Sequence, residues 1–185
     1  MTFHYDFEET DAFATGAIGT PGQRTFFLQV RAEGRTIAIK CEKQQVAQMA
    51  EHLRNLLEDV PSPSATPRPQ IAMLESPVEP DFVLGTIGLG VDRAAQRLVI
   101  QLEEAVMVDT EDLEDVDTED PDAVLEFIQR MEDETDASMV RVLITPEQAL
   151  AFCDVAENIV LAGRSQCRWC GGPIDPSGHA CPKMN

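Results

Sequence analysis

The sequence is poor in aromatic residues and in histidine. Eight Phe, one Tyr and one Trp occur in 185 residues, so a folded core must be mainly aliphatic. The three histidines are His4, His52 and His179. No Gly-x-Ser-x-Gly, P-loop or His-Glu-x-x-His motif is present, and we identify no catalytic residue. The sequence therefore favours a non-enzymatic role, with an enzyme as the alternative.

Signals for export and for membrane insertion are also missing. The N-terminal stretch has neither the basic region nor the apolar region of a secretory signal peptide. No apolar run approaches the roughly 18 residues that a membrane-spanning helix requires. We therefore expect a cytoplasmic protein that does not associate with membranes.

Cysteine falls into two groups. Of the five cysteines, three lie close to the C-terminus, and the other two, Cys41 and Cys153, lie in apolar stretches. Buried free thiols are common in reducing compartments, where disulfides are rare. We expect Cys41 and Cys153 to be buried free thiols, with a disulfide between them as the alternative.

Negative charge is concentrated in one segment. Residues 103–136 contain sixteen of the 33 acidic residues and one basic residue, whereas the rest of the chain is nearly balanced. We interpret this segment as a solvated loop followed by a short helix that begins at Asp120-Pro121. The loop either keeps the protein soluble or attracts a partner with a basic surface. Its charge disfavours binding to nucleic acid.

Three short stretches recur in the same order in the two halves of the chain. Gly16-x-x-Gly19 recurs as Gly85-x-x-Gly88, and two strand-like stretches recur after it. The recurring pairs are residues 26–30 with 98–102 and residues 37–41 with 140–144. Such self-similarity is typical of a duplicated structural unit.

Each half ends in a stretch with helical periodicity. The apolar face predicted over residues 43–58 consists of Val46, Met49, Ala50, Leu53, Leu56 and Leu57. Thr145-Pro146 is a typical start for the second helix, with Gln148 at the capping-box position. Its predicted buried face consists of Leu150, Phe152, Cys153, Ala156, Ile159 and Val160.

These patterns predict an α+β fold of two repeated β-β-β-α units. A small sheet with one helix rarely buries enough surface alone, so we expect the units to pack together with pseudo-two-fold symmetry. A Pro-rich stretch separates them. The predicted domains are a first unit at 1–59, a linker at 60–80, a second unit at 81–164 with the acidic insert 103–136, and a zinc knuckle at 165–185.

The C-terminus carries a metal-binding pattern, Cys-x2-Cys-Gly followed by His-x-Cys. In the Cys-x2-Cys-Gly turn two thiolates face one ion, and the glycine tolerates the backbone angle that the turn requires. The four predicted ligands are Cys167, Cys170, His179 and Cys181. Four such ligands leave no open coordination position, so we predict one structural Zn²⁺. An iron–sulfur cluster is the weaker alternative, since three Cys and one His suit zinc better.

Two other patterns are less specific. Residues 16–22 are rich in glycine, but strand-like sequence follows where a phosphate-binding loop needs a helix, so we expect turn glycines. Arg24 and Arg97 lie beside predicted strands. If they share a face they could bind a phosphate or an acidic ligand. Solvated strand faces with cross-strand pairs are the alternative.

The whole chain resembles an uncharacterised family, found mainly in actinobacteria, that is known as a domain of unknown function. The resemblance rests on Phe-Glu-x-x-Asp-x-Phe at residues 7–13, the turn at residues 16–22 and the Cys and His pattern at the C-terminus. It implies the same zinc ligands. It also implies a partner among neighbouring uncharacterised proteins, one of which is similar to a kinase fold.

Our leading hypothesis is a non-enzymatic zinc protein that binds another protein through its sheet or its knuckle. The first alternative is a small-ligand or phosphate-binding module, or an enzyme, with its site between the two units. The second is association with RNA or the ribosome through the knuckle, where Arg164 and Arg168 flank Trp169 as a base-stacking residue. The overall acidity weighs against this second alternative. The sequence does not predict an oligomeric state.

Overall fold

The computed structural model is a mixed α+β fold with seven strands and two helices in its described part. The described residues are 2–20, 22–60, 74–76, 78–106, 137–162, 167–171, 174 and 181–183. The strands are β1 (His4–Phe7), β2 (Ala12–Ile18), β3 (Thr25–Ala32), β4 (Arg35–Cys41), β5 (Phe82–Asp92), β6 (Arg97–Glu104) and β7 (Met139–Ile144). The helices are α1 (Lys43–Leu56), which the 3-10 turn η1 (Leu57–Asp59) extends, and α3 (Pro146–Leu161).

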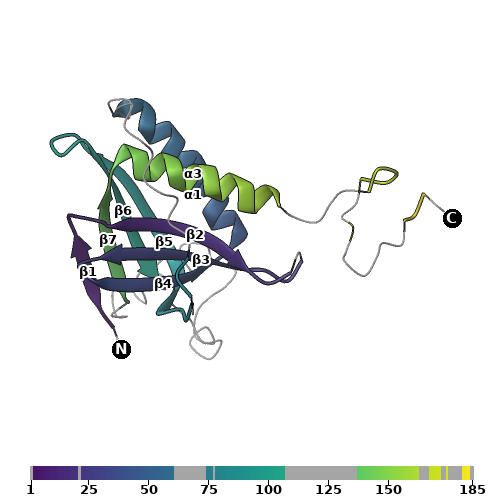
Figure 1. Cartoon of the computed structure of the whole chain (residues 1–185), viewed down its shortest axis with the longest axis horizontal. Helices are drawn as coiled ribbons and strands as arrows, with labels where there is room; N and C mark the ends of the chain where they lie inside the picture. Colours follow the sequence, from purple (N-terminus) through teal and green to yellow (C-terminus); the bar gives the residue numbers. More distant parts are fainter. Residues whose placement is uncertain are drawn as a thin grey trace, which may run out of the picture.

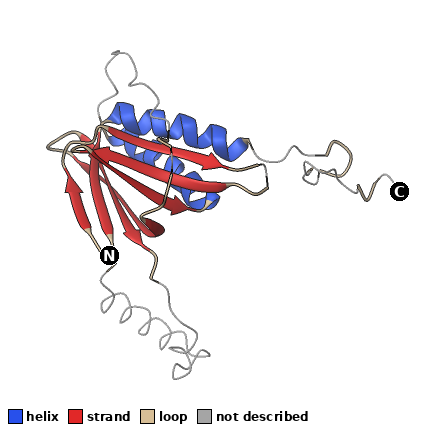
Figure 2. Cartoon of the chain, turned by 60° about the horizontal axis from the view of Figure 1, so that its bottom comes forward, coloured by secondary structure: helices blue, strands red, loops and turns tan. Residues whose placement is uncertain are grey.

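All seven strands form one sheet in the order β1-β7-β6-β5-β4-β3-β2. Neighbouring strands are antiparallel except at two places, where β1 pairs with β7 and β4 pairs with β5 in parallel. Helices α1 and α3 contact each other and lie on the same side of the sheet, as Figures 1 and 2 show. The two layers enclose one hydrophobic core.

The sheet must be strongly curled, because its two edge strands are consecutive in the chain. Only residues 8–11 connect β1 to β2. Five Cα–Cα steps span at most about 19 Å, whereas the outer strands of a flat seven-stranded sheet lie about 29 Å apart. A contact across the sheet agrees with this, since Arg35 Nη1 in β4 donates to the Tyr5 hydroxyl in β1 at 3.2 Å.

The strand registers are the same in the two halves of the chain. In β3 and β4, Phe26 pairs with Cys41 and Val30 with Ile37. In β6 and β7 the corresponding pairs are Leu98 with Ile144 and Leu102 with Val140. These registers agree with the two strand matches predicted from the sequence. Each half also continues from its third antiparallel strand directly into a helix.

The predicted match of Gly16 with Gly85 is wrong in this register. Gly16 pairs with Phe27, and the residue in the equivalent position beside β6 is Gly90, which pairs with Val99. Gly85 instead lies at a β-bulge between Leu84 and Ile87. The glycine spacing therefore coincided by chance, because the two glycines have different places in their strands.

Both helices begin with a capping box, and in each the box glutamine also donates to a backbone carbonyl outside the helix. In α3 the Thr145 amide donates to Gln148 Oε1 at 2.9 Å and the Gln148 amide to Thr145 Oγ1 at 3.2 Å, as predicted. Gln148 Nε2 then donates to the Thr10 carbonyl at 2.7 Å. Gln45 of α1 donates in the same way to the Leu84 carbonyl at 3.2 Å. These bonds attach the N-terminus of α1 to β5 and the N-terminus of α3 to the connection that precedes β2.

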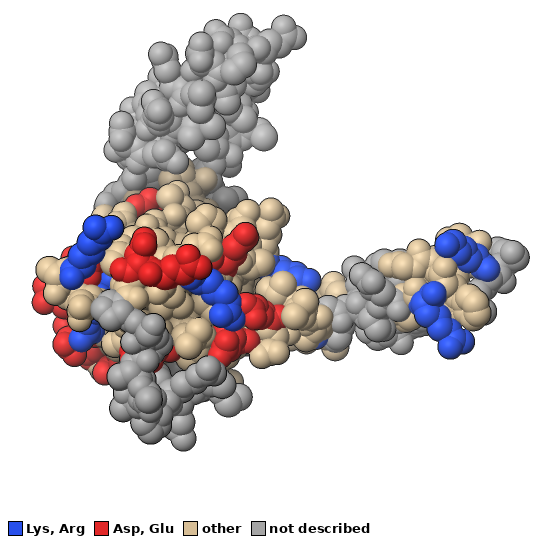
Figure 3. Space-filling model, turned by 90° about the horizontal axis from the view of Figure 1, so that it is seen from above, with Lys and Arg blue, Asp and Glu red and all other residues tan. Residues whose placement is uncertain are grey.

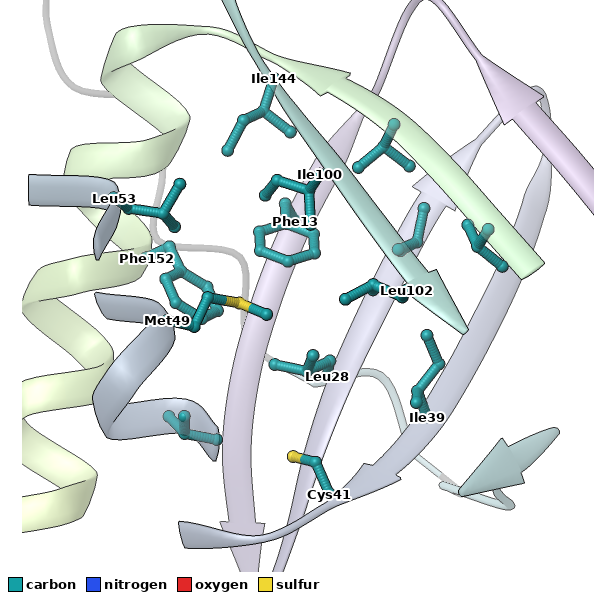
Figure 4. Close-up of a cluster of buried hydrophobic side chains, with 14 of the residues drawn as sticks. Phe13, Leu28, Ile39, Cys41, Met49, Leu53, Ile100, Leu102, Ile144 and Phe152 are labelled. Atoms are coloured by element: carbon teal, nitrogen blue, oxygen red, sulfur yellow. The ribbon is translucent and has the colours of Figure 1, made fainter. Parts of the chain in front are cut away.

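The core is mainly aliphatic, as the composition predicts. Phe13 of β2 and Phe152 of α3 stack inside it with ring centroids 4.9 Å apart, and Leu28, Ile100 and Leu102 surround them (Figure 4). Four of the predicted residues of α1 are buried, whereas Leu56 and Leu57 only pack against the edge of the core. Neither helix in the described part of the chain is long and apolar enough to cross a membrane.

The prediction that Leu150 of α3 is buried is wrong. Leu150 is partly exposed, and the buried positions around it are Ala149 and Ala151. The helix approaches β2 and α1 closely, since Cys153 Sγ reaches the Ala50 carbonyl at 3.4 Å. The buried face of α3 is formed by Phe152, Cys153 and three alanines, and Leu150 lies outside it.

Two predicted features lie outside the described residues. The helix predicted at Asp120-Pro121, with most of the acidic insert, falls within residues 107–136. Most of the Pro-rich linker falls within residues 61–73. The proposed domain boundaries that depend on these segments stay predictions.

Candidate metal centre

The candidate metal centre begins with a tight turn at Cys167. Residues 168–170 form the turn, which the Gly171 amide closes by donating to the Cys167 carbonyl at 2.8 Å. Gly171 has a φ of 75°, in the left-handed region that residues with a Cβ rarely adopt. A glycine is therefore needed directly after the second cysteine, as the sequence pattern predicts.

This turn aims backbone amides at the first sulfur. The amides of Cys170 and Trp169 donate to the Cys167 sulfur, with Cys170 as the larger contribution, and they lower the pKa of Cys167 to about 6. Burial raises the pKa of the Cys181 thiol above its usual value. Because a metal ion binds the thiolate, the turn prepares Cys167 as a ligand at neutral pH.

Three cysteine sulfurs meet at this turn. The Sγ atoms of Cys167, Cys170 and Cys181 all lie within 4.8 Å of one another, and those of Cys167 and Cys181 are 3.8 Å apart. A disulfide needs a sulfur–sulfur distance of about 2.0 Å, so these are free thiols. Tetrahedral zinc with bonds of about 2.3 Å places its sulfur ligands about 3.8 Å apart. The cluster therefore has the dimensions to hold one metal ion.

The fourth predicted ligand, His179, lies outside the described residues. Three of the four predicted ligands are therefore brought together in the structure. The three thiolates alone would carry a charge of −3, and a divalent ion would offset most of it. The donor set of soft sulfur ligands suits zinc, copper(I) or iron and does not suit calcium or magnesium.

The two predicted ligand-binding arginines contact different segments. Arg24 Nη1 donates to the Ile159 carbonyl near the end of α3 at 3.4 Å. Arg97 donates to the Glu8 carbonyl and to the Glu9 carboxylate, both at 3.5 Å, in the connection between β1 and β2. Each guanidinium therefore has a partner among the described residues, and a role for the two arginines in ligand binding stays a prediction.

Beside the cysteines lies an exposed aromatic residue. Trp169 is 54% exposed, and the Arg168 guanidinium lies 5.0 Å from its ring centroid. The charged residues in the described part of the C-terminal segment are Arg168 and Lys183, whereas the body carries both signs of charge (Figure 3). The sequence had indicated Trp169 as a stacking residue, and the cation–π contact with Arg168 adds a basic group to it.

The fold and the cluster together define an α+β protein with three C-terminal cysteines that could hold a metal ion. The chain belongs to the family described as "Protein of unknown function (DUF3090)", whose model matches residues 5–181. This range includes every strand except the first residue of β1, both helices and all three cysteines. No curated protein and no solved structure matches the chain.

Proposed function

We propose that the chain is a non-enzymatic interaction protein whose C-terminal segment is held together by one structural zinc ion. The ligands are Cys167, Cys170, His179 and Cys181. The observation that carries this is the meeting of three sulfurs within 4.8 Å around a turn that already lowers the pKa of one thiol. A fourth ligand from the protein closes the coordination sphere, which fits a structural role and leaves no position for substrate.

The body of the protein is, in this proposal, two β-β-β-α units related by a pseudo-two-fold axis. The equal registers of β3–β4 and β6–β7 support the duplication. The two parallel pairings support it too, because Phe82 pairs with Ile39 and Phe7 pairs with Val142, at positions that match between the units. A single curled sheet then acts as a rigid support for the knuckle.

The surface that meets the partner includes Trp169 and Arg168. Tryptophan and arginine are enriched among the residues that contribute most to protein–protein binding. Among the described residues, Trp169 is not one of the partly buried hydrophobic side chains that pack against the core. The partner is therefore expected to be a protein with an acidic or apolar pocket for this pair.

The test compares Trp169→Ala with the wild-type full chain in crosslinking from the native host. Wild-type protein should capture a specific partner that Trp169→Ala loses while it keeps its zinc. The matched control is Ile18→Ala, which removes another exposed apolar side chain, 49% exposed in β2, and should retain the partner.

Two results would contradict the proposal. If Trp169→Ala captures the same partner with equal yield, the knuckle is only a structural element. The protein instead acts as an RNA-binding factor if wild type captures RNA, Trp169→Ala does not, and high salt releases the RNA from wild type. Salt has this effect because it weakens contacts with phosphate.

A further inference from the structure

Gln29 is a buried amide on the side of the sheet that faces away from the helices. It lies in β3 between Leu28 and Val30, which belong to the core, so alternation along the strand directs it to the opposite face. An outward position on a sheet is usually solvated, yet Gln29 is only 2% exposed. Some other part of the chain must therefore cover it.

A short segment outside any helix or strand, residues 74–76, lies against Gln29. Gln29 Nε2 donates to the Glu75 carbonyl at 3.2 Å, and the Glu75 amide donates to Gln29 Oε1 at 2.8 Å. One side-chain amide thus binds both polar groups of a backbone residue, much as a neighbouring strand would. The Arg31 guanidinium also forms an ion pair with the Glu75 carboxylate.

The surface around Gln29 includes four small residues, Ala12, Ala14, Gly16 and Ala38, which leave room for a chain to lie on it. We call it the Gln29 surface, and it consists of Ala12, Ala14, Gly16, Phe27, Gln29 and Ala38. Leu74 lies directly over Gly16, where a Cβ would be 2.5 Å from Leu74 Cδ1. The absent side chain of Gly16 therefore makes the pocket for Leu74.

In the described part of the chain, no segment forms such hydrogen bonds with the corresponding glutamine of the second half. Gln101 of β6 pairs with Gly88 and Arg141, is partly exposed, and donates to Glu103 within its own strand at 2.5 Å. The burial of Gln29 therefore depends on residues 74–76. Its position in the sheet alone does not explain it, because Gln101 has the corresponding position and is partly exposed.

From this contact we propose that the Gln29 surface is a docking site for an extended peptide of a partner protein. Such a peptide carries an aliphatic residue followed by an acidic one, and residues 74–76 occupy the site in its absence. The aliphatic residue fills the space over Gly16, the amide of Gln29 binds the peptide backbone, and Arg31 pairs with the acid. The site is independent of the proposed metal centre.

The energetics of the contact allow exchange. The side chain of Glu75 is 54% exposed, and an ion pair at such a surface contributes little. The tethered segment competes as a ligand at an effective concentration on the order of millimolar. A partner peptide with more contacts than these three residues can therefore replace it.

The test uses a fluorescein-labelled peptide with the sequence of residues 72–78 and the full-length protein, with binding measured by fluorescence anisotropy. The double variant Leu74→Ser/Glu75→Ala should bind it at least about tenfold more tightly than wild type, because the tethered competitor is weakened. Adding Gln29→Ala should reverse this gain. Adding Gln101→Ala, the matched control on the same face, should not.

A second variant guards against a folding defect in the first. Glu75→Arg changes an exposed side chain and should keep the circular dichroism spectrum and melting temperature of wild type while it also increases peptide binding. A peptide with its Glu replaced by Arg should bind less well to this variant. In the Leu74→Ser/Glu75→Ala background, where residue 75 cannot form the ion pair, adding Arg31→Glu should restore the binding of that peptide.

Two outcomes would overturn the proposal. If neither folded variant binds the peptide at millimolar concentration, or if Gln29→Ala leaves the binding unchanged, residues 74–76 are a structural part of the fold only. If wild type instead forms dimers in light scattering that the double variant loses, the surface accepts residues 74–76 of a second copy and has no separate partner.

Discussion

Gly171 is the residue on which the geometry of the cysteine turn depends most directly. Its φ of 75° is in the left-handed region, and no heavy atom lies within 4 Å of the position that a Cβ would occupy. Gly171→Ala should therefore act through backbone strain of about 1 kcal/mol, which lowers zinc affinity about fivefold. Zinc competition titration measures this effect. Gly90→Ala also adds a Cβ in open space, at a strand position without positive φ, and should leave zinc affinity unchanged.

Cys41 should make the stability of the protein depend on alkaline pH. Burial raises its pKa from 9.0 to about 12, so below pH 9 the thiol is protonated in both the folded and the unfolded chain. Between these values only the unfolded chain loses the proton, and the free energy of unfolding falls by up to about 1.4 kcal/mol per pH unit.

Urea denaturation at about pH 8 and about pH 10 measures this loss. Cys41→Ala should show a smaller decrease than wild type, and so should Cys153→Ala, since burial raises the pKa of Cys153 to about 11. An equal decrease in the free energy of unfolding between the two pH values, in wild type and in Cys41→Ala, would contradict the account.

Single residues differ in how far the sequence could reveal them. The spacing of the three C-terminal cysteines was sufficient to predict that they lie close together. The apolar residues around Cys41 and Cys153 were sufficient to predict two buried free thiols. Both predictions depend only on nearby residues. Gln29 could not be recognised, because its partner Glu75 is 46 positions away and nothing local distinguishes a buried glutamine from a solvated one.

The two helices depend on their N-terminal glutamines. Gln148 closes the capping box of α3 and also donates to the Thr10 carbonyl at 2.7 Å, so it has two roles. Gln148→Ala should lower the free energy of unfolding by about 2 kcal/mol, and Thr145→Ala, which loses the cap alone, by about 1 kcal/mol. Urea denaturation measures both. Equal effects of the two substitutions would show that the bond to Thr10 contributes nothing.

At the level of elements, local patterns predicted the capping box, the strands β3, β4, β6 and β7, and both helices. In the turn between β3 and β4, Glu33 and Gly34 both adopt positive φ. β1 was missed, because it has four residues and only Phe7 is buried. The β-bulge in β5 was missed too, since its cause is the register of the partner strand.

The whole molecule is organised by the curled sheet, and this was the least predictable feature. Parallel pairing of β1 with β7 joins the start of the chain to residues about 135 positions later. Composition and periodicity contain no signal for such a pairing. The order of many strands and of both helices along the chain was predictable because each depends on a consecutive segment, whereas the pairing of distant strands depends on the packing of the complete core.

The central claim, one zinc ion bound per chain, is tested most directly by native mass spectrometry of the full-length protein with metal analysis. Wild type should carry one zinc, and Cys170→Ser and His179→Ala should each lose most of it, whereas Cys41→Ala should keep it. A wild-type chain without bound metal, or a Cys170→Ser variant that retains a full equivalent of zinc, would contradict the account.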